Sequence, residues 1–484
     1  MTTGSSSAPP ARAGTNAVLA YVGITGIVIA LMMVFGLLMR LGQGGMVAIP
    51  PDRFYQIMTA HGIGMVGIAG LGGAAVMWYF LRQYVRLSVA IFVANLLLFL
   101  LGVVLILGAT FIGGFAAAWT FLYPLPAHSG GTWSAAAAAV YLIGVLVVGV
   151  GFLLLFLDVG RALIQKYGGL GRALGWPQLF AGDRSEGPPP TVVASTVVTI
   201  MNVLAIVVGA AILTMSLINA LAPGFGIDAL LAKNLIFFFG HVFINSTIYM
   251  AVIAVYEVLP RYAARPWKAS KVFLAAWTAT LAMVLAVYPH HLLMDFAMPQ
   301  WALWMGQILS YTSGFPVLLV TAIGTLAIVY KSGMRWDLAS GLLFLSVFGW
   351  AAGVLPAIID ATIVVNQVMH NTMWVPGHFH FYLLLGLVAM LFGFMYYLGK
   401  AEGKREDSVL DRATFWLYAV AGLALVASFL LAGRAGVARR WAVHLPEWVG
   451  YDRAAVLFGA LAVIAALVFL IRFLGRLRAI AAGG

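Results

Sequence analysis

The stretch of sequence that decides the fold runs from Thr372 to Leu398 and is TMWVPGHFHFYLLLGLVAMLFGFMYYL. It contains no aspartate, glutamate, lysine or arginine, and a helix of roughly 20 such residues crosses a membrane. His378 and His380 are therefore polar groups inside an apolar span, where ionisable side chains are costly and usually functional. The fold follows from the other spans of this kind, and the function follows from the other histidines.

Apolar spans recur along the whole chain. Of the 484 residues, 63% are hydrophobic and only 9% are charged, whereas soluble domains have about 25% charged residues. Such a chain cannot cover its surface with polar groups, so lipid must surround it. The spans that we expect are 16–40, 57–81, 88–112, 135–158, 192–218, 234–257, 272–290, 302–330, 338–360, 372–398, 413–433 and 453–473. The fold class is thus an all-α membrane protein with about 12 transmembrane helices.

The distribution of charge orients these helices. Lysine and arginine are concentrated in the loops on the side of both termini, which the positive-inside rule makes cytoplasmic. The formal net charge of +12 is thereby explained by topology, and we expect no nucleic-acid partner. We predict a disordered cytoplasmic segment over 1–14, one 12-helix domain over 15–484, and a place in the bacterial inner membrane.

Six of the nine histidines fall at one depth. Each lies early in a span that runs inward or at the end of a span that runs outward, so all six occupy one layer toward the extracytoplasmic face. One such histidine would most simply satisfy an interhelical hydrogen bond, but six in one layer indicate a site for metals, because imidazole is the commonest metal ligand. The six are His61, His241, His290, His291, His378 and His380.

The spacing of the histidines refines this hypothesis. His378 and His380 are about 200° apart around a helix, so one helix can serve two centres on opposite flanks. His290 and His291 are about 100° apart, and Pro289 removes a backbone donor just before them. A helix loosened there can turn both rings toward one ion. His241 supplies a third nitrogen, and three imidazoles with an open position suit copper, zinc or iron.

Four motifs resemble those of the haem–copper oxidoreductase catalytic subunit, the subunit I of cytochrome oxidases. They are FYQIMTAHG ending at Gly62, FFFGH ending at His241, YPHH ending at His291, and HNTMWVPGHFH ending at His380. The resemblance covers nearly the whole chain, and the last motif is similar to that of the B-type branch. It implies a respiratory enzyme of electron transport with a low-spin haem, a high-spin haem and one copper ion, CuB.

The resemblance also implies a role for each matching residue. His61 and His380 would be the axial ligands of the low-spin haem, and His378 would be the proximal ligand of the high-spin haem. The copper ligands would be His241, His290 and His291. Contacts with the haem propionates are implied for Arg439, Arg440, His370 and Asn366, where Asn366 stands in the place of a B-type aspartate. The default haem is b-type in both positions.

One departure from the family pattern bears on the reaction. Oxygen-reducing B-type members carry a tyrosine four residues after the first copper histidine, whereas here that residue is Asn245. Four residues make about one helical turn, so Asn245 shares the face of His241. The family's tyrosine supplies an electron and a proton in cleaving the O–O bond, and an amide cannot. C-type oxidases carry the tyrosine in another span, at a position that is Val284 here.

Loss of the tyrosine favours nitric oxide reduction, which needs only two electrons and two protons, and so a role in denitrification. Reductases with non-haem iron carry a glutamate at the same offset, and Asn245 is not a carboxylate, so copper is the expected metal. Asn245 either hydrogen-bonds a species bound at the metal or satisfies a backbone carbonyl. The alternatives are a terminal oxygen reductase, and a secondary transporter without haem.

The supply of protons and electrons is only partly visible. Tyr256 matches a tyrosine of the B-type proton route. Its hydroxyl either takes part in such a route or has only a structural role. The sequence has no cysteine, which excludes a two-cysteine copper centre and a C-x-x-C-H haem site in this chain. A partner subunit of the copper or cytochrome c type must then deliver electrons from the extracytoplasmic side.

Overall fold

The computed structural model describes residues 9–401 and 407–483, and all the regular elements among them are helices. The first half of the chain forms α1 (Pro9–Gln43), α2 (Pro51–Leu81), α3 (Val89–Phe111), α4 (Ala135–Tyr167), α5 (Leu170–Ala173), α6 (Trp176–Phe180), α7 (Pro190–Leu221) and α8 (Ala229–Ala263). The second half forms α9 (Lys271–Ala286), η1 (Tyr288–Leu292), α10 (Gln300–Ser313), α11 (Phe315–Val329), α12 (Leu338–Asp360), α13 (Ile363–Met369), α14 (Trp374–His380), η2 (Phe381–Val388), α15 (Ala389–Ala401), α16 (Val409–Arg434), η3 (Pro446–Trp448) and α17 (Val449–Gly483).

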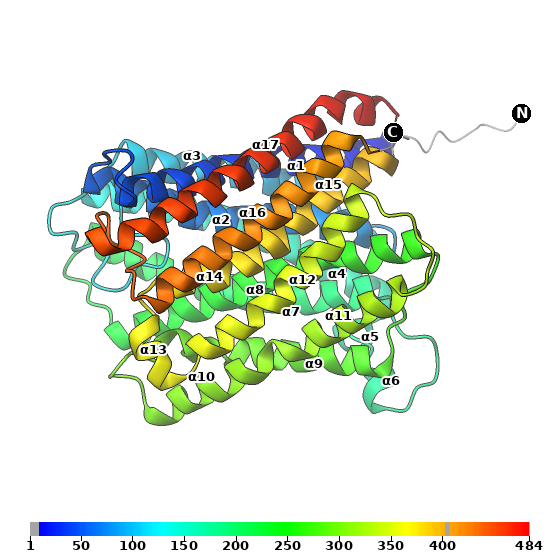
Figure 1. The fold of residues 1–484 in the computed structure, drawn as a ribbon. Coiled ribbons are helices and arrows are strands. Elements are labelled where there is room, and N and C mark those ends of the chain that lie inside the picture. Colours follow the sequence, from blue (N-terminus) through cyan, green and yellow to red (C-terminus); the bar gives the residue numbers. More distant parts are fainter. Residues whose placement is uncertain (1–8, 402–406, 484) are drawn as a thin grey trace, which may run out of the picture.

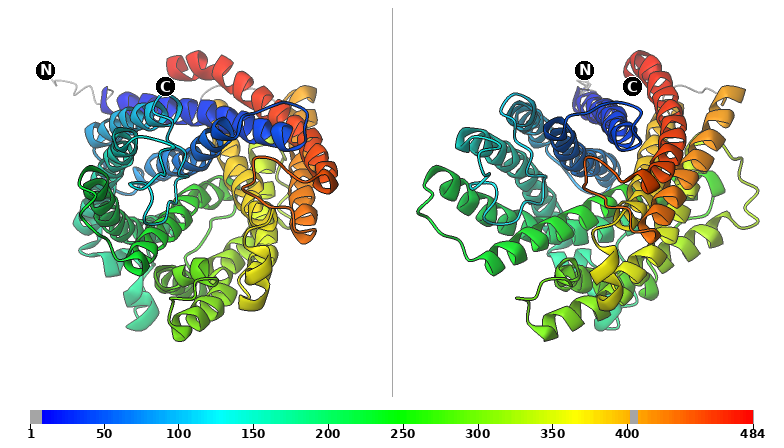
Figure 2. Two further views of the ribbon diagram at one scale, coloured as in Figure 1. Left: turned by 90° about the vertical axis from the view of Figure 1, so that its left-hand side faces the viewer. Right: turned by 60° about the vertical axis from the view of Figure 1, so that its left-hand side comes forward.

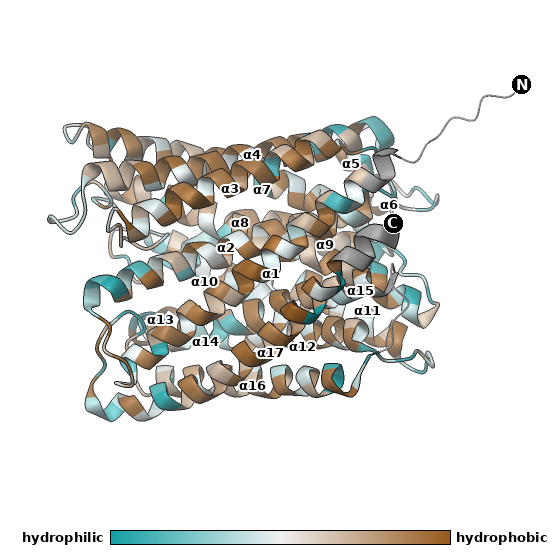
Figure 3. Ribbon diagram, turned by 90° about the horizontal axis from the view of Figure 1, so that it is seen from above, coloured by the Kyte–Doolittle hydropathy of each residue, from teal (hydrophilic) through white to brown (hydrophobic). Residues whose placement is uncertain are grey.

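Twelve of the described stretches are long and apolar enough to cross a membrane, which confirms the predicted fold class. The long helices run side by side in one bundle, with both chain ends at the same end of it (Figure 1). Two further views show how the helices surround the interior (Figure 2). Hydropathy colouring places apolar residues along the helices and polar residues at the two ends (Figure 3). We call the end that carries α5 and α6 the terminal end, and the other the opposite end.

The helices begin where the sequence offers a cap. Ser88, Ser134 and Ser270 each accept a hydrogen bond from the backbone three residues on, at the starts of α3, α4 and α9. Asp228 does the same for α8. These side chains satisfy backbone donors that a helix start leaves without partners, which is most important near lipid. Each cap fixes where a span begins, and therefore the depth of the residues behind it.

Several spans differ from the predicted ones in internal structure. The span predicted over 302–330 is divided into α10 and α11, with Gly314 between them, and the span predicted over 372–398 contains a π-helical segment directly after His380. Insertions of π-helix are frequent at functional sites. The disorder predicted for 1–14 falls partly on residues 1–8, which lie outside the described residues, whereas 9–14 belong to α1.

The centre of the bundle is formed by the spans that carry the single histidines and the His378–His380 pair. In the most apolar 18-residue stretch of each span, 78% of the residues are buried in α2, 78% in α8 and 89% between Trp374 and Gly399, compared with 28–61% in the other spans. Close helix contacts surround this centre: a Cβ at Gly102 of α3 would lie 2.5 Å from the Gly144 carbonyl oxygen of α4. Small residues at such contacts let membrane helices pack tightly. His61, His241, His378 and His380 are therefore held by the most enclosed spans.

Candidate metal centre

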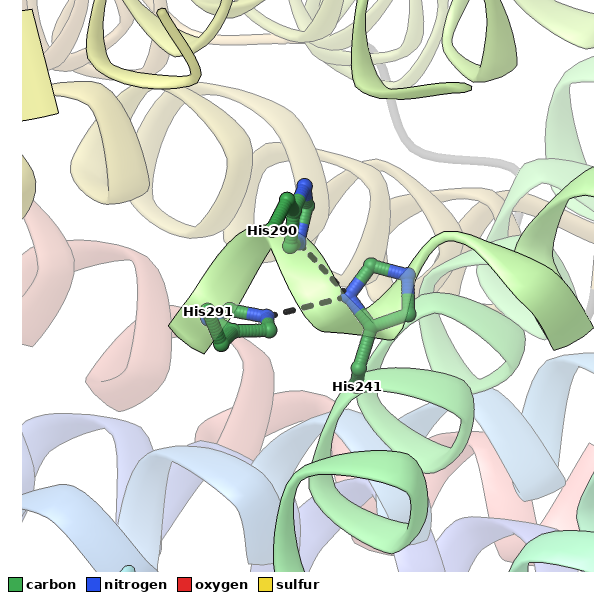
Figure 4. Close-up of side chains that lie close together, drawn as sticks. All are labelled: His241, His290 and His291. Atoms are coloured by element: carbon green, nitrogen blue, oxygen red, sulfur yellow. Dashed lines mark hydrogen bonds between the residues drawn. The ribbon is translucent and has the colours of Figure 1, made fainter. Parts of the chain in front are cut away.

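Three histidine rings converge between α8 and η1 (Figure 4). Nδ1 of His241 lies 3.0 Å from Nε2 of His291 and 3.1 Å from Nε2 of His290. One proton on His241 could serve only one of these neighbours, so the arrangement is not satisfied by hydrogen bonds alone. Nδ1 of His290 lies 2.8 Å from Ser310 Oγ, and by donating there it keeps the Nε2 lone pair for a metal. The donor set fits a copper ion.

The local sequence explains why both rings of the His290–His291 pair reach one point. The α-helix α9 ends at Ala286, and the pair lies in the 3-10 turn η1 with Pro289 directly before it. α10 packs closely on this turn, since a Cβ at Gly306 would lie 2.7 Å from the backbone nitrogen of His290. A loosened helix end at Pro289 is what the sequence predicted.

Two polar contacts attach this turn to α8. Tyr288 donates to the Asn234 side-chain oxygen at 3.0 Å, and Lys233 pairs with Asp295 at 2.5 Å. Both partners on α8 lie about two turns before His241. The turn is thereby held in register with the third histidine, and the Tyr288 hydroxyl is engaged away from the triad.

His61 of α2 and His380 of α14 form a second arrangement. Their rings are nearly parallel, at 14°, with centroids 6.5 Å apart. Nδ1 of His61 lies 2.7 Å from the Met32 carbonyl oxygen, and Nδ1 of His380 lies 2.7 Å from the Pro376 carbonyl oxygen. A carbonyl accepts only, so both Nδ1 atoms carry the proton and both Nε2 atoms keep a lone pair. Both rings line a cavity of 290 Å³, and this pair of lone pairs fits two axial ligands of one iron.

His378 lies on another side of α14. The residues that line the cavity of His61 include Phe379 and His380 but not His378. The ring of His378 lies 5.4 Å from that of Tyr382. Among the described residues, its Nδ1 atom is buried without a hydrogen-bond partner. A buried nitrogen left in this way is consistent with a group that completes the site.

The loop between α16 and α17 brings two arginines to the His61 cavity. Arg439 and Arg440 both line it. Burial, with a further contribution from the charge of Arg440, lowers the pKa of Arg439 to about 9, against the opposing charge of Asp360. Among the described residues, Arg439 Nε is buried without a hydrogen-bond partner. A buried guanidinium nitrogen without a partner is costly, and a carboxylate is the natural bidentate partner of an arginine. The pair therefore fits the propionates of a haem.

Asn366 and His370 lie together between α12 and α14. The Asn366 amide donates to the Asp360 carbonyl oxygen at 2.7 Å and lies 3.3 Å from Asp360 Oδ1. The same amide nitrogen lies 3.4 Å from His370 Nδ1. Asp360 thus brings a carboxylate to the neighbourhood where the resemblance implies an aspartate at 366. It went unnoticed in the sequence because it stands at the end of another span.

Asn245 and Tyr256 lie at different levels of α8. The Asn245 amide nitrogen donates to the His241 carbonyl oxygen at 2.8 Å and lies 3.4 Å from His241 Nε2. Tyr256 is buried toward the terminal end, where its hydroxyl lies 2.6 Å from Thr321 Oγ1 of α11. Asn245 therefore contacts the triad, whereas Tyr256 does not.

Besides Asp360, three more residues near these sites were not predicted. Ser310 bonds the His290 ring, Arg40 lines the His61 cavity, and His444 is buried and bonded to Asp452. A basic residue within a turn or two of the end of an apolar span is the signal that could have identified Arg40. Ser310 and His444 depend on contacts between distant segments, which no local pattern records.

Comparison with known proteins gives the class. The family described as "Cytochrome C and Quinol oxidase polypeptide I" matches residues 16–469. The chain belongs to this family of haem–copper oxidase subunits, and it is a multi-pass membrane protein. The resemblance stated from the four motifs is thereby confirmed, and the family implies haems and copper as cofactors.

Individual relatives are distant. A cytochrome c oxidase subunit 1 from Thermus thermophilus is 26% identical over 51% of this chain and 48% of its own length. A cytochrome c oxidase subunit 1 from Cereibacter sphaeroides is 26% identical over 46% of this chain and 39% of its own. A Halobacterium salinarum cytochrome c oxidase polypeptide 1 is 24% identical over 90% and 73%. The chain thus spans about half or less of the first two relatives.

The fold comparison extends over almost the whole chain. A solved haem–copper terminal oxidase dimer superposes with a TM-score of 0.79, covering 98% of this chain and 84% of the other at 19% identity. At this identity the likeness shows the architecture alone.

Proposed function

We propose that this chain is the catalytic subunit of a nitric oxide reductase, which joins two molecules of nitric oxide into nitrous oxide. The ligands would be His61 and His380 for a low-spin haem, His378 for a high-spin haem, and His241, His290 and His291 for copper. When bound, these groups would supply the electrons for the reduction. The haems are proposed to be b-type.

The observation that carries the proposal is the contact of Asn245 with His241. The amide nitrogen lies 3.4 Å from Nε2, on the side of the ring away from the nitrogens that converge on Nδ1. Oxygen-reducing relatives of the B-type branch place an oxidisable tyrosine at this offset. An amide can donate or accept a hydrogen bond but cannot supply an electron, which favours a reaction that needs two electrons over one that needs four.

The proton supply is assigned to Tyr256 at the terminal end. Tyr256 lines a hollow of 1530 Å³ together with Glu257, and its hydroxyl reaches Thr321 at 2.6 Å. Glu257 accepts hydrogen bonds from Tyr84 at 2.8 Å and Thr191 at 2.5 Å. The hydroxyl of Tyr256 can therefore take a proton from the hollow and present it to Thr321.

Electrons are proposed to arrive from a partner subunit at the opposite end, where Arg439 and Arg440 lie over the low-spin site. The charge asymmetry of the loops supports cytoplasmic termini, and the chain is proposed to lie in a bacterial inner membrane. Arg439, Arg440, His370 and Asn366 are proposed as the contacts of the haem propionates.

The alternative is a terminal oxygen reductase, and the names of the relatives favour it, since they are cytochrome c oxidases. Purified protein kept reduced by an excess of a chemical electron donor, and supplied with nitric oxide under argon, separates the two. The proposal expects continuous nitrous oxide formation, and a His291→Ala variant, which lacks a copper ligand, serves as the inactive control. Absence of nitrous oxide from a preparation that contains both haems and copper would exclude the proposal.

A further inference from the structure

The loop that carries Arg439 and Arg440 is attached to the segment before α14 by its backbone. Met373 donates to the Val437 carbonyl oxygen at 2.8 Å, and Arg439 donates to the Asn371 carbonyl oxygen at 3.1 Å. The two strands of chain also form an isolated antiparallel bridge. The position of the two guanidinium groups therefore depends on how this loop is held from its other side.

His444 holds the loop from that side. Its Nε2 atom lies 2.9 Å from the carbonyl oxygen of Ala438, the residue directly before Arg439. Its Nδ1 atom lies 2.6 Å from Asp452 Oδ2 at the start of α17. The His444 side chain has no exposed surface, so water cannot replace either contact. The ring links the arginine loop to α17.

The partners determine where the protons lie. The Ala438 carbonyl oxygen can only accept, so His444 Nε2 carries a proton. The contact with Asp452 then holds one further proton, on Nδ1 or on the carboxyl group. In either case the imidazole and the carboxyl group together have no net charge, and the pair is a neutral buried link.

Asp452 continues the link to the proposed low-spin site. Its other oxygen, Oδ1, lies 3.4 Å from the Arg40 guanidinium at the end of α1. Arg40 in turn lies 3.2 Å from Met373 Sδ and over the ring of Phe429, at 5.6 Å. The Phe429 ring lies 5.1 Å from that of His380. Both ends of the link thus reach residues around the cavity that His61 and His380 line.

We propose that His444 is a positioning residue, which sets the reduction potential of the low-spin haem by holding the Arg439–Arg440 loop against its site. The proposal rests on the haem assignment made above. Two positive groups near a haem favour its reduced form, because reduction removes one positive charge from the centre. A loop that moves outward would therefore lower the reduction potential of that haem.

Two substitutions of similar size separate the two contacts of the ring. In His444→Gln the amide nitrogen takes the place of Nε2 and keeps the bond to Ala438, whereas in His444→Asn it takes the place of Nδ1 and keeps only the bond to Asp452. His128, an exposed histidine of another loop at the opposite end, gives the matched controls His128→Gln and His128→Asn. The readout is the midpoint potential of each haem in the intact protein, from a spectroelectrochemical titration.

We expect His444→Asn to lower the ratio of reduced to oxidised low-spin haem at a fixed potential at least tenfold, which is about 59 mV for one electron. His444→Gln and both His128 variants should keep the wild-type midpoint potential of the low-spin haem. The proposal would be overturned if the low-spin haem of His444→Asn kept its wild-type midpoint potential, or if that potential shifted equally in both His444 variants. If His444→Asn does not accumulate, His444→Ala is measured in its place against His444→Gln.

Failure of this inference is distinguishable from failure of the haem assignment. Wild-type protein without the spectrum of a six-coordinate low-spin haem would contradict the assignment of His61 and His380. Wild-type protein with that spectrum, together with potentials that do not respond to His444, would contradict only the positioning role.

Discussion

The carboxamide nitrogen of Asn245 lies 3.4 Å from Nε2 of His241 and donates to the carbonyl oxygen of the same residue at 2.8 Å. Asn245 is thus in contact with a histidine of the triad, and it satisfies a helix carbonyl at the same time. Of the two roles that the sequence left open for this residue, the structure shows the hydrogen bond to a backbone carbonyl. A hydrogen bond to a species bound at the metal stays a prediction. The backbone bond fixes the amide, and a fixed amide is a better hydrogen-bond donor at a reaction site.

Replacing the amide tests its contribution to turnover. We expect Asn245→Leu, which has the same branched shape and no polar group, to lower nitrous oxide formation about fivefold, because one hydrogen bond contributes about 1 kcal/mol. The rate is measured with nitric oxide under argon. Asn202, a buried asparagine of α7 bonded to Ser246, provides the control Asn202→Leu for general effects on packing. An unchanged rate in Asn245→Leu would remove Asn245 from the reaction.

The bond between Ser310 and the His290 ring predicts a change in metal affinity. Ser310→Ala removes the acceptor that fixes the ring, and changes of this kind weaken metal binding about 10–100-fold. We expect copper content to fall after dialysis against a chelator while haem content stays constant. Thr312→Ala, an exposed hydroxyl of the same helix, should keep its copper. Equal copper retention in the two variants would contradict the role of Ser310 in fixing the His290 ring.

Removal of one hydroxyl tests the proton route. Tyr256→Phe keeps the ring and deletes the group that contacts Thr321 at 2.6 Å. We expect turnover to fall about 10²-fold, the lower range for loss of a positioned proton donor, with the optical spectra of both haems unchanged. Tyr141→Phe serves as the control, because it deletes a buried hydroxyl of α4 that has no hydrogen-bond partner in the part of the chain that the structure describes. Full turnover in Tyr256→Phe would move the proton route elsewhere.

The contact between α14 and α16 predicts a stability effect. A Cβ at Gly433 would lie 2.1 Å from the backbone nitrogen of Trp374, at the start of the helix that carries His378 and His380. Gly433→Ala should therefore destabilise the protein by about 1–3 kcal/mol, as overpacking does. Thermal unfolding in detergent measures it. Gly450→Ala, where a Cβ meets nothing within 4 Å, should be neutral, and equal effects at both positions would contradict the packing argument.

Much of the fold could be predicted because lipid restricts the chain to apolar spans. The positions of the histidines in the spans indicated the depth of the site and the side of the membrane toward which it lies. They also indicated correctly that the rings of His290 and His291 can meet at a loosened helix end. The interruption at Gly314 and the π-helix after His380 could not be predicted in this way. Both depend on packing against neighbouring helices, which hydropathy alone does not record.

The site was predictable only as far as single spans could determine it. The sequence placed His241 at the depth of the His290–His291 pair, whereas the structure shows that α8 and η1 are neighbours. The link from Arg40 through Asp452 to His444 joins positions that are about 400 residues apart. His444 was assigned no role in the sequence, because a histidine in a polar loop gives no sign of burial.

The choice between nitric oxide and oxygen as substrate is tested by supplying each gas in turn to one preparation of reduced, haem- and copper-loaded enzyme. We expect one nitrous oxide to form for every two nitric oxide molecules consumed, at a rate well above that of oxygen consumption. Rapid reduction of oxygen to water by the same preparation, with no nitrous oxide formed, would contradict the account.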